Sequence, residues 1–395
     1  MIPTYREAFN ANFTPEKYQY FLGKLGEGYP AIPFRVAETP IFIPETLSKK
    51  LIAAGEEIIA LINQPNFKEL TDRAVPKDWA VPNENDHPHF LTFDYGICRN
   101  EQGELMPLLI EMQGFPSLYG FQSHLAKNYK SAFGLADQLT PYFGNLSETE
   151  YFDLLSSVIL GDHLPHQVAL MDVDAAQQKT AIDFFITARH LGIKILPLTE
   201  IKREGRKLFY EENGQKIQLK RIYNRLIFDE ITDQQELLAS GFDPREELDI
   251  EWVTHPNWFY RISKFTMPFL DSEFVPKTQF LDKIESIPVD LENYVLKPLF
   301  SFAGMGVIID VTTADIEGIK DPENWILQKK VTYEPVIQSP DGGVKAEIRM
   351  MYVWPNQGSP QLCINLARLS RGKMIGVRYN KDFDWVGGTV GLMEK

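Results

Sequence analysis

Hydrophobic residues recur along the first half of the chain with two different periods. Apolar positions three and four residues apart over Pro44–Asn63 predict a helix. His89–Cys98 and Leu105–Gln113 are apolar runs that predict strands, and the turn residues Asn100–Gly103 between them predict a hairpin. Two more helices are expected over Tyr119–Phe133 and Glu148–Leu160.

From residue 168 the pattern changes to short apolar strands around a helix. Val168–Val173 and Ile193–Leu198 flank the helical segment Ala175–Leu191, an order that predicts a parallel βαβ unit. Asn213-Gly214 is typical of a hairpin turn. The strands expected around and after that turn are Lys207–Tyr210, Lys216–Leu219 and Arg221–Phe228.

The last third is rich in strands joined by Gly, Pro and Asp turns. The strands expected here are Tyr294–Leu299, Gly306–Val311, Trp325–Val331, Ala346–Trp354 and Gln361–Ser370. A strand-rich segment behind a βαβ segment predicts a mixed α/β and α+β chain. We expect three regions, which span residues 1–150, 151–262 and 263–395.

Composition narrows the class of protein. The 395 residues carry 40 basic and 54 acidic side chains and are 44% hydrophobic, which excludes a chain that is disordered as a whole. The net charge of −14 argues against a nucleic-acid partner, because phosphate binding needs clustered cations. Cys98 and Cys363 give no disulfide framework, so a cytoplasmic location is expected. No stretch approaches the about 18 apolar residues of a membrane helix, and no membrane partner is expected.

A glycine-containing loop follows a strand that carries a lysine. Lys297 lies in the strand, and the loop contains the small residues Ser301, Ala303, Gly304 and Gly306. Small residues let backbone N–H groups approach phosphates closely. A P-loop is excluded because its lysine follows the glycines, and a dinucleotide fingerprint is excluded because no helix follows. The alternative is an ordinary hairpin with a surface lysine.

Charged residues also lie inside the late apolar strands. Strand alternation places Glu347 and Arg349 on one face, and the next strand carries Asn365 and Arg368. Charges in apolar strands are costly unless they are paired or bind a ligand. An anionic ligand accounts for both arginines, and a sheet with one wet face is the alternative.

The 89–113 hairpin carries three oxygen-bearing side chains. Asp94 lies in its first strand, and Glu111 and Gln113 lie in its second. Depending on the turn, Asp94 is diagonal to Glu111 or directly opposite it, and in both registers the three share a face. Oxygen ligands from two strands suit Mg²⁺. The alternative is a solvent-facing side of a hairpin.

These features in this order resemble the ATP-grasp ligases, in particular the permuted group that includes glutathionylspermidine synthase. The resemblance covers roughly residues 89–395. Lys297-Pro298 and the loop match the family's phosphate-covering segment, and Ile262-Ser263-Lys264 with Pro268 and Leu270 is similar to its earlier lysine segment. Arg368-Leu369-Ser370 is similar to the family's late strand. The resemblance implies an ATP-grasp-like nucleotide domain behind a small α/β domain.

The resemblance also implies roles for individual residues. The nucleotide-binding set it suggests is Lys264, Lys297, Ser301, Ala303, Gly304, Gly306, Gln328, Lys329, Lys330, Val331, Glu334 and Asn365. Asp94, Glu111 and Gln113 occupy the place of the family's metal segment, with Gln113 in place of its Asn. Gly114-Phe115-Pro116-Ser117 departs from the family's Asp/Thr-rich run, which puts glutathione as a substrate in doubt. No amidase-like Cys–His half is present.

Other polar residues have weaker claims to a function. His163 and His166, like His87 and His89, are expected to be loop histidines rather than zinc ligands. Arg225 lies near a strand end of the α/β segment, where ligands bind in such folds. Arg225 is therefore a candidate for a substrate carboxylate, and an ion pair with Asp229 or Glu230 is the alternative.

The expected function is that of an ATP-dependent carboxylate–amine ligase acting through an acyl phosphate. Lys264 and Lys297 would hold phosphates, Mg²⁺ would bind the hairpin, and Arg349 or Arg368 would stabilise developing charge. The substrates would be a small-molecule acid and an amine, both unidentified, and the oligomeric state stays open. The alternatives are a non-catalytic nucleotide-binding protein and a phosphotransferase.

Overall fold

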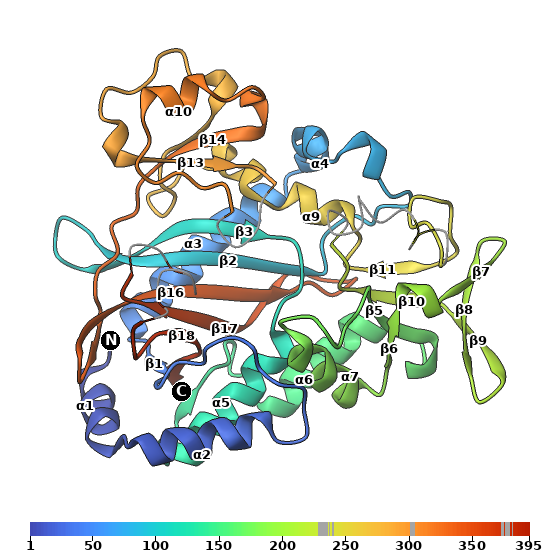
Figure 1. Ribbon diagram of the computed structural model, residues 1–395, viewed down its shortest axis with the longest axis horizontal. Coiled ribbons are helices and arrows are strands. Elements are labelled where there is room, and N and C mark those ends of the chain that lie inside the picture. The colour runs from blue at the N-terminus through green and yellow to red at the C-terminus, as the bar shows by residue number, and fades with distance from the viewer. Residues whose placement is uncertain are drawn as a thin grey trace.

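The protein is a mixed α+β structure in which several smaller sheets surround one large central sheet (Figure 1). The computed structural model describes residues 1–227, 236, 238, 241–300, 305–372, 375, 380 and 382–395. Most helices lie below the central sheet in this view. A lobe that contains β13 (Tyr294–Pro298) and β14 (Trp325–Lys329) lies above it. The mixed fold class expected from the sequence is confirmed.

The central sheet has the strand order β18-β17-β16-β2-β3, and its neighbouring strands are antiparallel. Its strands are β2 (Phe90–Arg99), β3 (Leu105–Gln113), β16 (Gly342–Val353), β17 (Gln361–Ser370) and β18 (Gly387–Thr389), and β15 (Ile337–Ser339) also pairs with β16. The predicted hairpin therefore shares a sheet with strands of the last third. The expected boundaries at 150 and 262 divide this continuous sheet.

Strand alternation gives the central sheet an apolar face and a charged face. Phe93 and Met350 belong to the apolar core that also contains the buried side of α3 (Glu45–Ile62). In α3, buried residues recur at three- and four-residue spacing, as the sequence predicted. A Cβ added to Gly55 of α3 would collide with the ring of Tyr352, so the helix packs closely on the sheet.

Two helices begin and end where the sequence predicted because their caps are local. The side chain of Ser147 and that of Glu150 form a capping box at the start of α6 (Glu148–Leu160). Gly134, with φ 61°, ends α5 (Tyr119–Phe133). Further helices outside the α/β region include α1 (Pro3–Asn12), α2 (Pro15–Gly26), α4 (Phe67–Thr71) and α9 (Asn257–Arg261).

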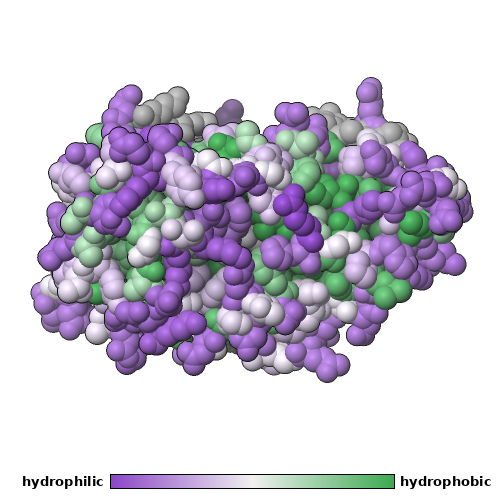
Figure 2. Space-filling view, turned by 90° about the horizontal axis from the view of Figure 1, so that it is seen from below, coloured by the Kyte–Doolittle hydropathy of each residue, from purple (hydrophilic) through white to green (hydrophobic). Residues whose placement is uncertain are grey.

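The lower face of the molecule is largely polar, and a small sheet joins segments from near both ends of the chain. Figure 2 shows hydrophilic residues over much of the face seen from below, where α2 lies in Figure 1. In the small sheet β1-β19-β4, β1 (Ile41–Phe42) pairs in parallel with β19 (Gly391–Glu394), and β19 also pairs with β4 (Leu139–Thr140). No helix in the described ranges is long and apolar enough to cross a membrane.

The predicted βαβ unit is present in a four-stranded parallel sheet of order β11-β10-β5-β6. Its elements are β5 (Val168–Asp172), α7 (Ala181–Leu191), β6 (Lys194–Pro197), β10 (Arg221–Asn224) and β11 (Glu251–Val253). α7 starts later than Ala175 because Asp172 binds the backbone N–H of Asp174 and turns the chain. The predicted hairpin lies in the projecting sheet (Figure 1) of β7 (Lys202–Glu204), β8 (Lys207–Glu212) and β9 (Gln215–Leu219).

The lobe has its own sheet, of order β12-β14-β13, and its own small core. β12 (Thr278–Phe280) and α10 (Thr313–Glu317) belong to it. The strand predicted over Gly306–Val311 is wrong, because only Ile308 bridges Leu296. Gly306 turns the chain with φ 70°, the chain bends again at Ile309 and Asp310, and Thr312 then caps α10, so pairing does not extend beyond Ile308.

Candidate functional site

A β-bulge in the central sheet brings Asp94 opposite Glu111. Near the turn Arg99 pairs with Leu105, a register midway between the two considered from the sequence. The register shifts between Asp94 and Tyr95, where Ile110 is the extra residue. The bulge also leaves the carbonyl of Ile110 free to accept a hydrogen bond from outside the hairpin.

Lys297, which belongs to the lobe, donates a hydrogen bond to this carbonyl. Its Nζ donates to the carbonyl of Ile110 at 3.0 Å and to Oε1 of Gln328 at 2.6 Å. Gln328 is held in turn by the hydroxyl of Thr278, which accepts from its Nε2 at 3.2 Å. Lys297 is therefore a fixed, buried cation that joins the lobe to the central sheet.

Burial lowers the pKa of Lys297 from 10.5 to about 8. The nearby carboxylates of Glu111 and Glu347 raise the pKa of Lys297, and the like charge of Lys264 lowers it further. An ammonium group that lacks a close carboxylate partner is well suited to a ligand that brings negative charge.

Lys264 lies beside the carboxylate of Glu111, the residue after Ile110. It begins the short 3₁₀ helix Lys264–Phe269, which Ser263 caps, and its Nζ lies 3.3 Å from Oε1 of Glu111. A cavity of about 20 Å³ adjoins this pair, with room for about one water. The residues that line it are Glu111, Met112, Gln113, Phe259, Ile262, Ser263, Lys264, Leu299 and Phe300. The structure thus brings together Lys264, Lys297, Gln328, Glu111 and Gln113.

The glycine loop is described only in part. Ser301, Ala303 and Gly304 lie outside the described residues. A Cβ added to Gly306 would lie 3.0 Å from Cγ of Pro298, which together with its positive φ favours glycine there.

The segment that follows β14 covers the charged face of the central sheet rather than an open pocket. Val331 and Tyr333 pack on Gly96, where an added Cβ would be closer than 3.2 Å to both. Lys330 donates to the carbonyl of Glu292 at 2.5 Å, and Lys329 is exposed. Glu334 pairs with Arg99 at 3.0 Å. Lys330 and Glu334 thus have protein partners in this conformation.

Asn365 is separated from the other predicted residues. It pairs with Met350 across the sheet, whereas Arg368 pairs with Glu347, so the two side chains point to opposite faces. Its amide is occupied by the carbonyls of Pro141 and Gly391 and by the N–H of Gly391. This position gives Asn365 a structural role, and we remove it from the nucleotide set.

The carboxylate of Asp94 accepts hydrogen bonds from two arginines. Nε and Nη2 of Arg349 bind its two oxygens at 2.5 and 2.6 Å, and Nη1 of Arg368 lies 3.1 Å from Oδ2. Burial raises the pKa of Asp94, but the two guanidinium groups outweigh this effect and hold the pKa below its usual value. Asp94 therefore does not fit a metal site, and Arg349, whose side chain is 4% exposed, offers little surface to a substrate.

Glu111 and Gln113 are the part of the predicted metal set that still fits Mg²⁺. The described residues contain no group of three or more His, Cys, Asp and Glu side chains able to hold a metal. Mg²⁺ commonly takes one or two protein oxygens and completes its shell with waters and substrate phosphates. Glu111 and Gln113 line the cavity beside Lys264 and suit that arrangement.

Arg225, the candidate for a substrate carboxylate, is buried at the end of β10. It is 5% exposed, and among the described residues its Nε and Nη1 have no hydrogen-bond partner. Asp229 and Glu230 lie outside the described residues, and among the described ones Asp183 is 4.0 Å away. Asp172, on the neighbouring strand, has an unpartnered buried Oδ2. The strand-end position was the available signal, whereas the missing partners become visible only in the fold.

Three of the four histidines expected to lie in loops contact other side chains of the protein. His163 contacts Glu251 at 3.1 Å, and His89 contacts Asn356 at 2.9 Å. His87 stacks on Trp354 with 4.4 Å between ring centroids.

The comparisons with known proteins identify a related fold. No family model matches the chain, and no curated protein matches its sequence. A solved structure that is similar is a glutathione synthetase-like effector, GSS30, from Globodera pallida in its apo form. The identity is 8%, 96% of each chain is covered, and the TM-score is 0.60. This likeness shows a shared fold and supports the ATP-grasp-like fold expected from the sequence.

Proposed function

We propose that the chain is an ATP-dependent carboxylate–amine ligase that releases ADP and phosphate. The observation that carries the proposal is that Lys297 and Lys264 meet at neighbouring residues of β3, Lys297 at the Ile110 carbonyl and Lys264 at the Glu111 carboxylate. Two buried cations beside a carboxylate and an amide suit a triphosphate with its metal ion. The likeness to a protein described as glutathione synthetase-like supports the choice of a ligase.

ATP would be held by Lys264 and Lys297, and Mg²⁺ by Glu111 and Gln113 together with the phosphates. When bound, ATP supplies the phosphoryl group that activates a carboxylate. The protein's part is to position the reactants and to neutralise charge. Because the cavity measures only about 20 Å³, the nucleotide must displace the bond between Lys297 and the Ile110 carbonyl or separate the lobe from the sheet.

The acid substrate would bind between Arg225 and the phosphate region. Arg225 offers two unpartnered nitrogens, and its guanidinium packs over Phe184 and Phe115 at 4.7 and 5.2 Å. Phe115 in turn contacts Phe259, which lines the cavity. A carboxylate is the ligand that a buried guanidinium with two open nitrogens favours most.

A non-catalytic nucleotide-binding protein is the second candidate. It is favoured by the loss of Asp94 from the metal set and by the small size of the cavity. A phosphotransferase would use the same nucleotide site but would form no amide.

Product analysis tests the proposal. The protein is incubated with Mg²⁺, ATP and a panel of small carboxylic acids and amines, and hydroxylamine is added to trap an acyl phosphate as a hydroxamate. ADP, phosphate and an amide are the expected products, and Lys297→Met serves as the blank. AMP and pyrophosphate would refute the mechanism. ATP binding without turnover for any pair would favour the non-catalytic alternative, and a phosphorylated product without an amide would indicate a phosphotransferase.

A further inference from the structure

Four charged side chains from three neighbouring strands form one network on the charged face. The register places Asp94 opposite Arg349 and Glu347 opposite Arg368. Nη1 of Arg368 bridges the two acids, 3.1 Å from Asp94 and 2.6 Å from Glu347. The hydroxyl of Tyr333 donates to the other oxygen of Glu347 at 3.1 Å. The two acids and two arginines balance in charge.

The members of this network differ in exposure. The side chains of Asp94, Arg349 and Glu347 are 4%, 4% and 7% exposed, but that of Arg368 is 31% exposed. Buried ion pairs seldom stabilise a fold more than apolar residues of similar size would. The three buried charges of Asp94, Arg349 and Glu347 are therefore better explained by a role in positioning the accessible guanidinium of Arg368.

Two nitrogens of the Arg368 guanidinium are not used by the network. Both acids bind the single nitrogen Nη1, and in the described part of the chain Nε and Nη2 make no hydrogen bond. The network lies beside the two lysines, because Asp94 is opposite Glu111 and Glu347 influences Lys297. A third, partly exposed cation thus lies on the same face of the central sheet as Asp94 and Glu111, beside the proposed phosphate region.

We propose that Asp94 is a positioning residue, which together with Glu347 orients Arg368 so that its Nε and Nη2 bind the terminal phosphoryl group of the nucleotide. This inference rests on the proposed function, and it assigns different tasks to the two arginines. Arg349 locks the plane of the Asp94 carboxylate by a bidentate contact, and Arg368 contacts the ligand.

The affinities for ATP and ADP test the proposal without a known acid or amine. Calorimetry in Mg²⁺ is carried out on the unmutated protein and on Asp94→Asn, Arg368→Gln and the double variant. Each single variant is expected to lose at least about tenfold in ATP affinity, the value of one charge-assisted hydrogen bond, and about twofold or less in ADP affinity. Because Asp94 acts through Arg368, the double variant should bind ATP no more weakly than Arg368→Gln.

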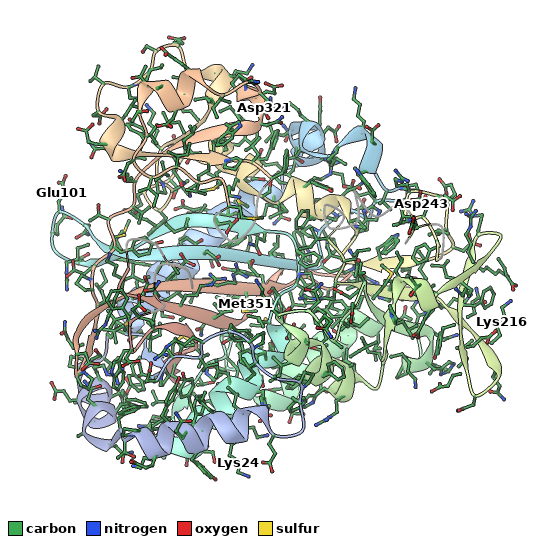
Figure 3. All side chains as sticks on the ribbon, in the orientation of Figure 1. Lys24, Glu101, Lys216, Asp243, Asp321 and Met351 are labelled. Carbon is green, nitrogen blue, oxygen red and sulfur yellow. The ribbon has the colours of Figure 1, made fainter. Side chains whose placement is uncertain are left out.

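The matched control is Asp243→Asn, which breaks another bidentate contact with an arginine, Arg245. Asp243 lies away from Met351 of the central sheet (Figure 3), so this change should leave both affinities unaltered. Equal losses for ATP and ADP in Asp94→Asn, or additive losses in the double variant, would overturn the positioning role. If Asp94→Asn does not fold, Arg368→Gln alone decides, and an unchanged ratio of ATP to ADP affinity there overturns the proposal. No ATP binding by the unmutated protein would instead refute the proposed function, and this inference with it.

Discussion

Replacing Lys297 by Met should change how the stability of the protein depends on pH. The pKa of Lys297 falls from 10.5 to about 8, mainly through burial, while Glu111 and Glu347 oppose the change and Lys264 adds to it. At about 1.4 kcal/mol per pH unit, the buried charged form costs roughly 3 kcal/mol of the free energy of unfolding near neutral pH. This cost is the energetic consequence of keeping a cation ready for a ligand.

The sign follows from the protons bound in each state. Below pH 8 both states hold the proton, and the folded state bears the whole cost. Between pH 8 and pH 10.5 the folded state has released the proton while the unfolded state keeps it, so stability rises with pH. Above pH 10.5 neither state holds the proton, and the cost is gone. Lys297→Met removes this contribution and should show a flatter profile.

Denaturant unfolding of both proteins across this pH range measures the difference. The native protein should gain up to about 3 kcal/mol relative to Lys297→Met between pH 8 and pH 10.5. The hydrogen bonds lost at Gln328 and Ile110 shift the whole curve of the variant but not its slope. Lys283→Met, with a side chain that is 71% exposed, is the matched control and should follow the native slope. Parallel curves for the native protein and Lys297→Met would refute the reasoning.

Three further changes probe the metal site, the acid site and the packing. Glu111→Gln should abolish the Mg²⁺-dependent part of ATP affinity measured by calorimetry but spare the metal-free part; unchanged Mg²⁺ dependence would remove Glu111 from the site. Arg225→Met should lower the thermal midpoint, because it leaves the buried carboxylate of Asp183 without its nearby cation, and an unchanged or higher midpoint would show that this pair does not stabilise the fold. Gly55→Ala should cost about 1–3 kcal/mol through its collision with Tyr352, whereas Gly23→Ala, with open space around it, should stabilise by about 0.5–1 kcal/mol. Equal effects of the two glycine changes in denaturant unfolding would contradict the packing.

Elements whose signals are local were predicted well from the sequence. Ser147 and Gly134 directly adjoin the helices they delimit, so α5 and α6 have the expected bounds. The segment Gly306–Val311 has strand-forming residues but meets its partner only at Ile308, and apolar content alone does not reveal that limit. Local pattern therefore predicts elements better than it predicts their pairing.

The site was predicted in part, for the same reason. Lys264, Lys297, Glu111 and Gln113 lie close together in the structure. Strand alternation fixes the face of Lys297, Glu111 and Gln113, whereas Lys264 begins a 3₁₀ helix. Asp94 was assigned to a metal because its partner, Arg349, lies 255 residues away and pairs with it only through the β2–β16 contact. The bulge at Ile110 likewise depends on how the strands meet.

The pairing of β2 with β16 also governs how the molecule can be made. On a growing chain the β2–β3 hairpin emerges long before residue 342, so its inner edge stays open while more than half of the protein is synthesised. During that time the carboxylate of Asp94 has neither of its guanidinium partners, and an exposed strand edge can pair with other chains. Long-range pairing of this kind slows folding. Chains truncated before β16 should therefore aggregate rather than accumulate as a stable fragment. The carboxyl-terminal strands would thus protect the hairpin edge from pairing with other chains as well as complete the sheet.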